Sequence, residues 1–255
     1  MGKLFNPDNS VMRFLSRVAD VLVVNLLTLM FFLPLVAGFF ITGLYMKNMI
    51  LIGIVLFATA LPIGPALTAM NYILLKFVRN EEGYIVRSYF HSFKDNLVQS
   101  MQVWALYLVF FVVLALDFYV SYNSESFPKA MKIALIVALV IIYAVFLWTF
   151  PLLSHFENNI KGTLRNAALL TMGCFPRTLG MIAMTAIPFV VLYFGQTAVL
   201  PIIIMFGIAG PGYGCAYLYN PSFKKFEPKE ETADKDPDAM PEALRDEPVR
   251  DKESE

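Results

Sequence analysis

The sequence predicts an all-α fold, a polytopic bundle of transmembrane helices with amphipathic cytosolic helices and a disordered C-terminal tail. Three observations lead to this prediction. The chain is 58% hydrophobic and only 16% charged, whereas roughly a quarter of the residues in a soluble domain are charged. Six apolar segments have about the 20 residues that a helix needs to cross a bilayer. The sequence lacks the alternation of apolar and polar residues that would indicate a transmembrane barrel.

The six apolar segments are the expected membrane spans. They cover residues 18–40, 49–75, 98–120, 131–153, 178–196 and 199–219. The chain is therefore expected to consist of an interfacial segment (1–17), a transmembrane helical domain (18–220) and an acidic tail (221–255). From Lys224 onward there are 12 acidic and 7 basic residues and almost no large apolar ones. Such a tail cannot bury enough apolar surface to offset its chain entropy, so we expect it to be disordered.

Lysine and arginine gather on one side of this six-span arrangement. The N-terminal segment, the loops after the second and fourth spans and the start of the tail are basic. The opposite side has only Lys47, Lys129 and Lys132. Because basic loops stay in the cytosol, we expect a multi-pass protein embedded in a lipid bilayer with both termini cytosolic.

The second expected span contains the motif L-P-I-G-P-A at residues 61–66. Pro62 and Pro65 each remove a backbone donor and Gly64 adds conformational freedom, so the helix should break or kink here. Two interpretations stay open. The free backbone groups, together with Asn71, form a substrate site inside the membrane, or the break is a packed kink.

Two cytosolic loops show the pattern of amphipathic helices, over residues 86–97 and 156–167. Their apolar residues recur at spacings of three and four, which places them on one face of a helix. The charged faces either anchor the protein at the lipid headgroups or dock a cytosolic partner. The candidate docking residues are Arg79, Glu81, Glu82, Arg87, Phe93, Lys94, Glu157, Asn158, Lys161, Arg165 and Arg177.

No motif in the sequence indicates an enzyme. There is no P-loop, no glycine-rich dinucleotide turn and no zinc-protease motif. His91 and His155 have no Cys or His at metal-ligand spacing, so we expect no metal site and no cofactor. Membrane topology explains the basic residues, so we expect no nucleic-acid partner. The sequence leaves the oligomeric state open.

Several stretches of the sequence resemble the YesL-like family of bacterial membrane proteins. The most specific of these stretches is R-N-E-E-G at residues 79–83. The matching pieces are F-N-P-D-N-S (5–10), Asp20, Asn25, L-P-I-G-P-A-L-T-A (61–69), 74–96, 150–167 and P-R-T-L (176–179). The chain departs from the family pattern at residues 36–60, which look like an insertion, and in its acidic tail.

The resemblance implies a protein of the bacterial cytoplasmic membrane without an established enzymatic activity. Members of this family accompany carbohydrate uptake systems of the ABC type. A weaker similarity to the coupling loop of ABC importer permeases rests on Glu157 and Pro176, which lie 19 residues apart.

Two hypotheses follow from the resemblance and the topology. The first is a permease-like or accessory subunit of an ABC-type carbohydrate importer, which contacts a partner subunit through its cytosolic helices. The alternative is a scaffold or regulator without a transport path. A water-filled cavity near Pro62 and Asn71 favours a transport path, and a dry, close-packed bundle favours the scaffold. A membrane enzyme would need a polar catalytic cluster, and none is evident.

Overall fold

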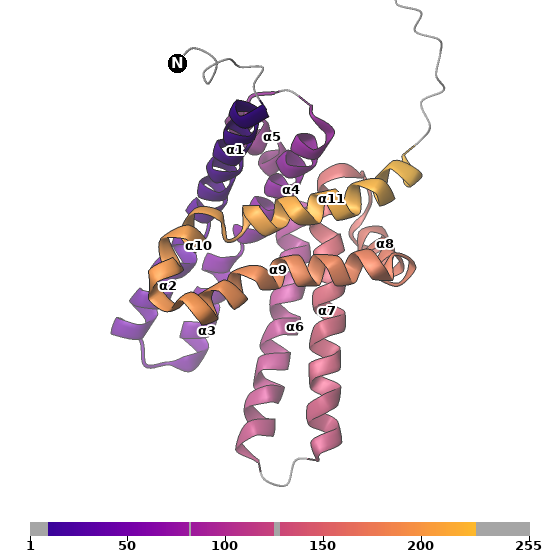
Figure 1. The fold of residues 1–255 in the computed structure, drawn as a ribbon. Coiled ribbons are helices and arrows are strands. Elements are labelled where there is room, and N and C mark those ends of the chain that lie inside the picture. The colour runs from indigo at the N-terminus through magenta and orange to yellow at the C-terminus, as the bar shows by residue number, and fades with distance from the viewer. Residues whose placement is uncertain (1–9, 82, 125–127, 228–255) are drawn as a thin grey trace, which may run out of the picture.

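The computed structural model describes residues 10–81, 83–124 and 128–227, and every regular element in these ranges is a helix (Figure 1). The all-α prediction is therefore confirmed. The elements are α1 (Ser10–Met30), α2 (Leu33–Tyr45), α3 (Met49–Ala60), α4 (Ile63–Arg79), α5 (Ile85–Asp95), α6 (Leu97–Asn123), α7 (Lys129–His155), α8 (Ile160–Gly173), α9 (Phe175–Gly195), the 3₁₀ helix η1 (Gln196–Val199), α10 (Leu200–Phe206) and α11 (Ala209–Phe226).

Among the described residues, five helical segments are long and apolar enough to cross a membrane. They are Val11–Tyr45, Met49–Arg79, Leu97–Asn123, Lys129–His155 and Phe175–Phe206. Their length and composition are those of a membrane protein. The predicted count of six spans is corrected, because the last one (199–219) is divided between α10 and α11. Pro211 explains the division, since a proline ring clashes with the carbonyl four residues before it, here that of Gly207.

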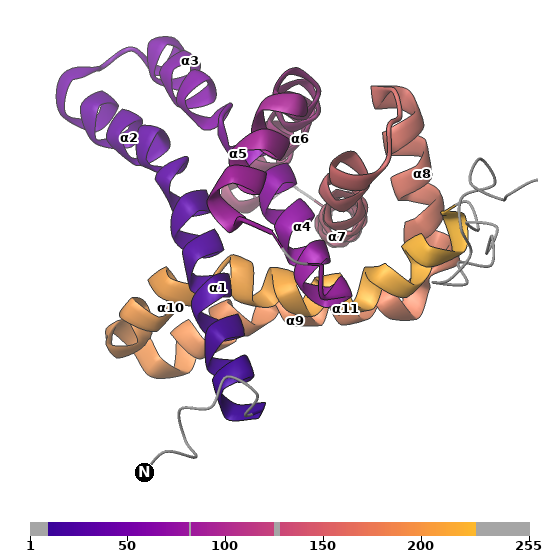
Figure 2. The ribbon, with the colours of Figure 1, turned by 90° about the horizontal axis from the view of Figure 1, so that it is seen from above.

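Helix α4 lies at the centre of the bundle and packs against α1, α5, α6, α7 and α11. Helices α6 and α7 form a long hairpin, and α2 and α3 form a second one (Figure 1). Helices α9 and α11 lie side by side and run crosswise to the α6–α7 hairpin, which Figure 2 views nearly end-on. The core is therefore built around α4, and most of its side chains are buried.

The L-P-I-G-P-A motif breaks the second span between α3 and α4, as predicted. The indole N–H of Trp104 on α6 donates to the carbonyl of Ala60 at 2.8 Å, so this carbonyl at the break is paired. A Cβ added to Gly64 would lie 2.5 Å from the Cβ of Trp104 and 2.6 Å from the carbonyl oxygen of Ser100. Gly64 therefore lets α6 approach closely, and the geometry is that of a packed kink.

The break between α10 and α11 is closed by Asn25 of α1, a fully buried residue. Its side-chain amide donates to the carbonyl of Ile204 at 2.8 Å. Its Oδ1 accepts from the N–H groups of Ile208 at 3.1 Å and Ala209 at 2.8 Å. Backbone groups left unpaired away from water are costly, and most of all in lipid. One side chain thus satisfies three backbone groups at this break.

Both predicted amphipathic helices are present with shifted bounds. Helix α5 covers Ile85–Asp95. Helix α8 begins at Ile160 rather than at 156, because Asn159 caps it: its Oδ1 accepts from the N–H of Gly162 at 2.7 Å.

The start of the acidic tail, predicted at 221, is also corrected, because α11 continues to Phe226. Ser222 and Phe223 are buried, and the Phe223 ring packs against Trp148 and His155. These contacts explain why residues 221–227 belong to the helical domain. The rest of the predicted tail (228–255) and residues 1–9 of the interfacial segment lie outside the described residues.

Replacing Asn25 with leucine tests the closure of the α10–α11 break. Asn25→Leu keeps a side chain of similar size but leaves two N–H groups and one carbonyl unpaired. We expect the free energy of unfolding to fall by about 2–5 kcal/mol, measured by denaturation in detergent micelles. Asn123→Leu is the control, because the exposed Asn123 side chain bonds, among the described residues, only to Tyr119 of its own helix. Equal stability of the two variants would contradict this assignment.

Alanine substitutions at two glycines test the packed kink. Gly64→Ala forces α6 away from α4, and we expect a loss of about 1–3 kcal/mol. Gly53→Ala on α3 meets no atom within 4 Å, and we expect a gain of about 0.5–1 kcal/mol from its higher helix propensity. Thermal unfolding of both variants measures this difference. A neutral Gly64→Ala variant would show that the break is open rather than packed.

Candidate functional site

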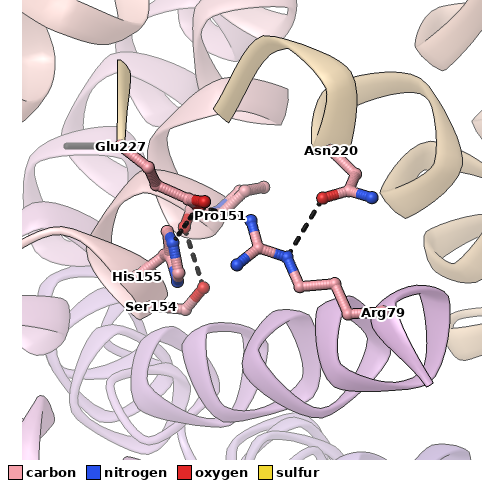
Figure 3. A network of polar contacts seen from close by, with 6 residues as sticks. All are labelled: Arg79, Pro151, Ser154, His155, Asn220 and Glu227. Atoms are coloured by element: carbon pink, nitrogen blue, oxygen red, sulfur yellow. Dashed lines mark hydrogen bonds and ion pairs between the residues drawn. The ribbon is translucent and has the colours of Figure 1, made fainter. Parts of the chain in front are cut away.

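The salt bridges between described residues lie at one end of the bundle, where α4, α5, α7 and α11 finish and α6 and α8 begin. Four residues at this end, Arg79, His155, Asn220 and Glu227, form what we call the polar clasp (Figure 3). They come from α4, α7 and α11 and from the residue that follows α11. The clasp therefore joins three helices that are far apart in the sequence.

Glu227 is the centre of the polar clasp. Its Oε1 lies 2.5 Å from a terminal nitrogen of Arg79 and 2.6 Å from Nε2 of His155. The Nε of Arg79 also donates to Oδ1 of Asn220 at 3.0 Å. The Arg79 and Glu227 side chains are only 15% and 28% exposed. A partly buried pair with several hydrogen bonds is stronger than an exposed surface pair, so the clasp can hold the end of α11 against α4 and α7.

The environment of Glu227 favours its charged form. Partial burial alone raises the pKa of this carboxyl. Hydrogen bonds from Arg79 and His155, together with their charges, outweigh burial and lower the pKa below its ordinary value of 4.5. The folded state therefore stabilises the Glu227 carboxylate at neutral pH.

A cavity of about 570 Å³, which we call the polar pocket, lies beside the clasp. Its walls include Tyr72 of α4, His91 and Ser92 of α5, Gln99 of α6 and residues 153–158. The side chain of Gln99 donates to the carbonyl of Asn158 at 2.5 Å and joins two of these walls. The pocket thus lies where α5 and the α7–α8 connection face each other.

Helix α5 is fixed to the bundle by its aromatic residues. Tyr89 is fully buried, and its hydroxyl donates to the carbonyl of Ala66 at 3.1 Å and lies 3.2 Å from Oγ1 of Thr28. Phe93 stacks on Phe31 with 4.3 Å between the ring centroids. The apolar face of α5 therefore packs against α1 and α4 and is not a free membrane anchor.

The structure separates the predicted docking residues into two groups. Three of them make internal contacts: Arg79 in the clasp, Arg177, which donates to Oγ of Ser222, and Phe93. The exposed residues are Glu81, Arg87, Lys94, Glu157, Lys161 and Arg165. Asn158 is half-buried and accepts from Gln99 through its carbonyl. Glu82 lies outside the described residues.

The predicted intramembrane site residues do not surround one polar cavity. Gly64 and Pro65 are buried and Pro62 is half-buried at the kink. Asn71 donates its side-chain N–H to the carbonyl of Leu67 in its own helix at 2.8 Å. Asn71 also borders a cavity of about 200 Å³ whose other walls are mostly apolar, among them Phe146 and Phe189.

His155, Asn220 and Glu227 were not among the predicted site residues. The expected tail (221–255) includes Glu227, although Tyr219, Phe223 and Phe226 continue a helical spacing beyond residue 220. That spacing was the signal for a helix reaching this point. Among the described residues, no group of three or more His, Cys, Asp or Glu side chains is arranged to hold a metal ion.

The pH dependence of stability tests the clasp. Because the folded-state pKa of Glu227 is lowered, its stabilising effect is complete above 4.5 and is lost as the pH falls through the lower, folded-state value. We expect Glu227→Gln to unfold at a lower temperature than the wild type at pH 7. The difference between the two should shrink as the pH falls below 4.5 and vanish once the Glu227 carboxyl is protonated in the folded state.

Glu81→Gln is the control for this experiment. Glu81 is an exposed carboxylate that forms no salt bridge with any described residue, so its replacement should change the melting temperature little. A Glu227→Gln melting curve identical to that of the wild type at pH 7 would show that the clasp does not stabilise the fold.

Part of the chain matches a known protein family. Residues 21–118 match the model of the family "Protein of unknown function, DUF624". The chain is also similar to "Uncharacterized protein YteU" of Bacillus subtilis (strain 168), with 24% identity over 157 residues, which are 59% of this chain and 68% of that protein. No solved structure matches the chain. The resemblance to a membrane-protein family of unknown function is therefore confirmed, and the match to the DUF624 model covers residues 21–118.

Proposed function

We propose that this protein is a non-transporting accessory subunit of a membrane assembly, which it contacts through charged residues at its polar end. The observation that carries the proposal is the close packing of the broken helix. The α3–α4 break is filled by Trp104 and by the backbone of α6. A transport path for a polar solute needs polar groups along it, and the cavity beside Asn71 is small and mostly apolar.

Five exposed charged residues form the proposed docking face. They are Arg87 and Lys94 on α5, Glu157 before α8, and Lys161 and Arg165 on α8. No salt bridge joins any of them to another described residue. Their charges are thus available to pair with a partner, and such pairs set specificity and association rate.

The docking face rests on rigid helices. Tyr89 and Phe93 hold α5 against the core, and Asn159 caps α8. A rigid surface loses less conformational entropy on binding than a mobile loop does. This supports a role in assembly with another protein over simple anchoring at the headgroups.

The partner that we propose is a subunit of an ABC-type carbohydrate importer in the bacterial cytoplasmic membrane. Two observations support this choice: the resemblance to a family that accompanies such systems, and the spacing of Glu157 and Pro176. In this proposal the polar end faces the cytosol, because its loops are richer in lysine and arginine than those at the opposite end. The alternative is a regulator of a sugar-utilisation system, and no catalytic activity is assigned.

Charge reversal on the docking face tests this function. The variant carries Arg87→Glu and Lys161→Glu, and its control carries Lys129→Glu at the opposite end of the bundle. After crosslinking in native membranes, the tagged protein is captured and importer subunits are quantified by mass spectrometry. We expect recovery to fall by about fivefold or more in the double variant and to stay unchanged in the control, with equal amounts of both proteins in the membrane.

Either of two results would contradict the proposed partner. One is that wild-type protein brings no importer subunit with it. The other is that the double variant recovers as much importer subunit as the wild type, which would place the contact elsewhere on the molecule.

A further inference from the structure

A second hollow at the polar end, which we call the α8–α11 groove, has a volume of about 540 Å³. It lies between α8, the end of α7 and the end of α11. Apolar side chains make up much of its lining: Leu152, Phe156, Leu169, Leu170 and Phe226. Leu169 and Phe226 are 58% and 63% exposed. An apolar hollow with polar residues at its rim is typical of a surface that binds another segment or molecule.

The polar part of the lining favours a peptide as the occupant. Asn158 and Asn166 are half-buried in the groove, and the side-chain amide of neither bonds to another described residue. A side-chain amide both donates and accepts hydrogen bonds. The N–H and C=O groups of a peptide backbone can satisfy both functions, whereas a lipid acyl chain can satisfy neither.

The charge of the groove favours an acidic peptide. Lys225 lines the groove, and no Asp or Glu does. Arg165 lies four positions before Leu169 on α8, so it shares a helix face with a lining residue, and it is exposed. Opposite charges across a binding surface favour association and fix its register.

An acidic segment of the same chain begins beside the groove. Phe226 lines the groove, and the described part of the chain ends one residue later, at Glu227. Residues 228–255 contain 11 acidic and 5 basic residues, and their only large apolar side chains are Met240, Leu244 and Val249. The 13 positions from Glu227 to Met240 can span up to about 40 Å. Because the tether is short, the effective concentration of Met240 at the groove is on the order of millimolar.

We propose that residues 238–246 (D-A-M-P-E-A-L-R-D), which we call the tail segment, dock in the α8–α11 groove of their own chain. Met240 and Leu244 then cover the apolar lining, and the acidic residues of the segment lie near Lys225 and Arg165. Arg165 also belongs to the docking face, so the bound tail segment competes with the partner for it and limits assembly. This competition rests on the proposed function, whereas the docking of the tail segment does not.

A disulfide crosslink within the full chain tests the proposal. Cys174 lines the groove, and Cys215 is buried and does not. The Met240→Cys variant is oxidised with copper–phenanthroline in native membranes, and the disulfide to Cys174 is identified by mass spectrometry. Such a bond needs Cα atoms within about 7 Å, so we expect it to form only if the tail segment reaches the groove.

Ala233→Cys is the matched control, because residue 233 lies seven positions closer to the end of α11. Chance collisions of a tethered chain favour the shorter loop, so they would crosslink this variant at least as fast. We expect Met240→Cys to crosslink to Cys174 about tenfold faster than Ala233→Cys does. Equal rates, or a faster reaction of Ala233→Cys, would overturn the proposal.

A second substitution separates docking from other occupants of the groove. Adding Leu244→Asp to Met240→Cys alters no described residue, and we expect it to slow the crosslink severalfold, because it removes half of the apolar contact. An unchanged rate would contradict docking through Met240 and Leu244. A disulfide-linked dimer would assign the groove to a second copy of the chain. No disulfide at all, with Cys174 still reactive toward maleimide, would leave the groove to lipid, and either result would refute the proposal. None of these readouts depends on an importer subunit.

Discussion

The structure depends on one constraint: backbone N–H and C=O groups that leave a helix inside lipid must find partners within the protein. Prolines and glycines break two of the apolar segments of this chain. At one break Asn25 of α1, a helix distant in the sequence but adjacent in space, pairs with three backbone groups. At the other, the Trp104 indole pairs with the carbonyl of Ala60. Both partners come from neighbouring helices, so each break also fixes how two helices pack.

This constraint separates the molecule into a closely packed interior and a polar end. The α3–α4 kink is closely packed and the cavity beside Asn71 has mostly apolar walls, whereas ionic contacts and the larger polar pocket lie where the helices end. Glu227 connects the two regions, because it holds the end of α11 over α4 and α7. Both proposed interactions, partner docking and the binding of the tail segment, therefore fall on the polar end.

Local signals in the sequence predicted much of this fold. The prolines of L-P-I-G-P-A predicted the kink, and the spacing of apolar residues predicted α5, because both effects act within a few residues. Pro211 and Asn159 also carried local signals, for the division of the last span and for the start of α8. The inward orientation of Arg79 had no such signal, since its partner Glu227 lies 148 positions away. The same holds for Phe93, whose partner Phe31 lies 62 positions away, in the turn between α1 and α2.

Hydrogen exchange at the α10–α11 break tests the central claim most directly. The N–H groups of Ile208 and Ala209 precede or begin a helix, a position where backbone donors are normally free. If Asn25 holds them, their exchange in nanodiscs will be as slow as that of the amides within α11. Exchange within seconds, at the rate of an open loop, would contradict the claim that a neighbouring side chain closes the break.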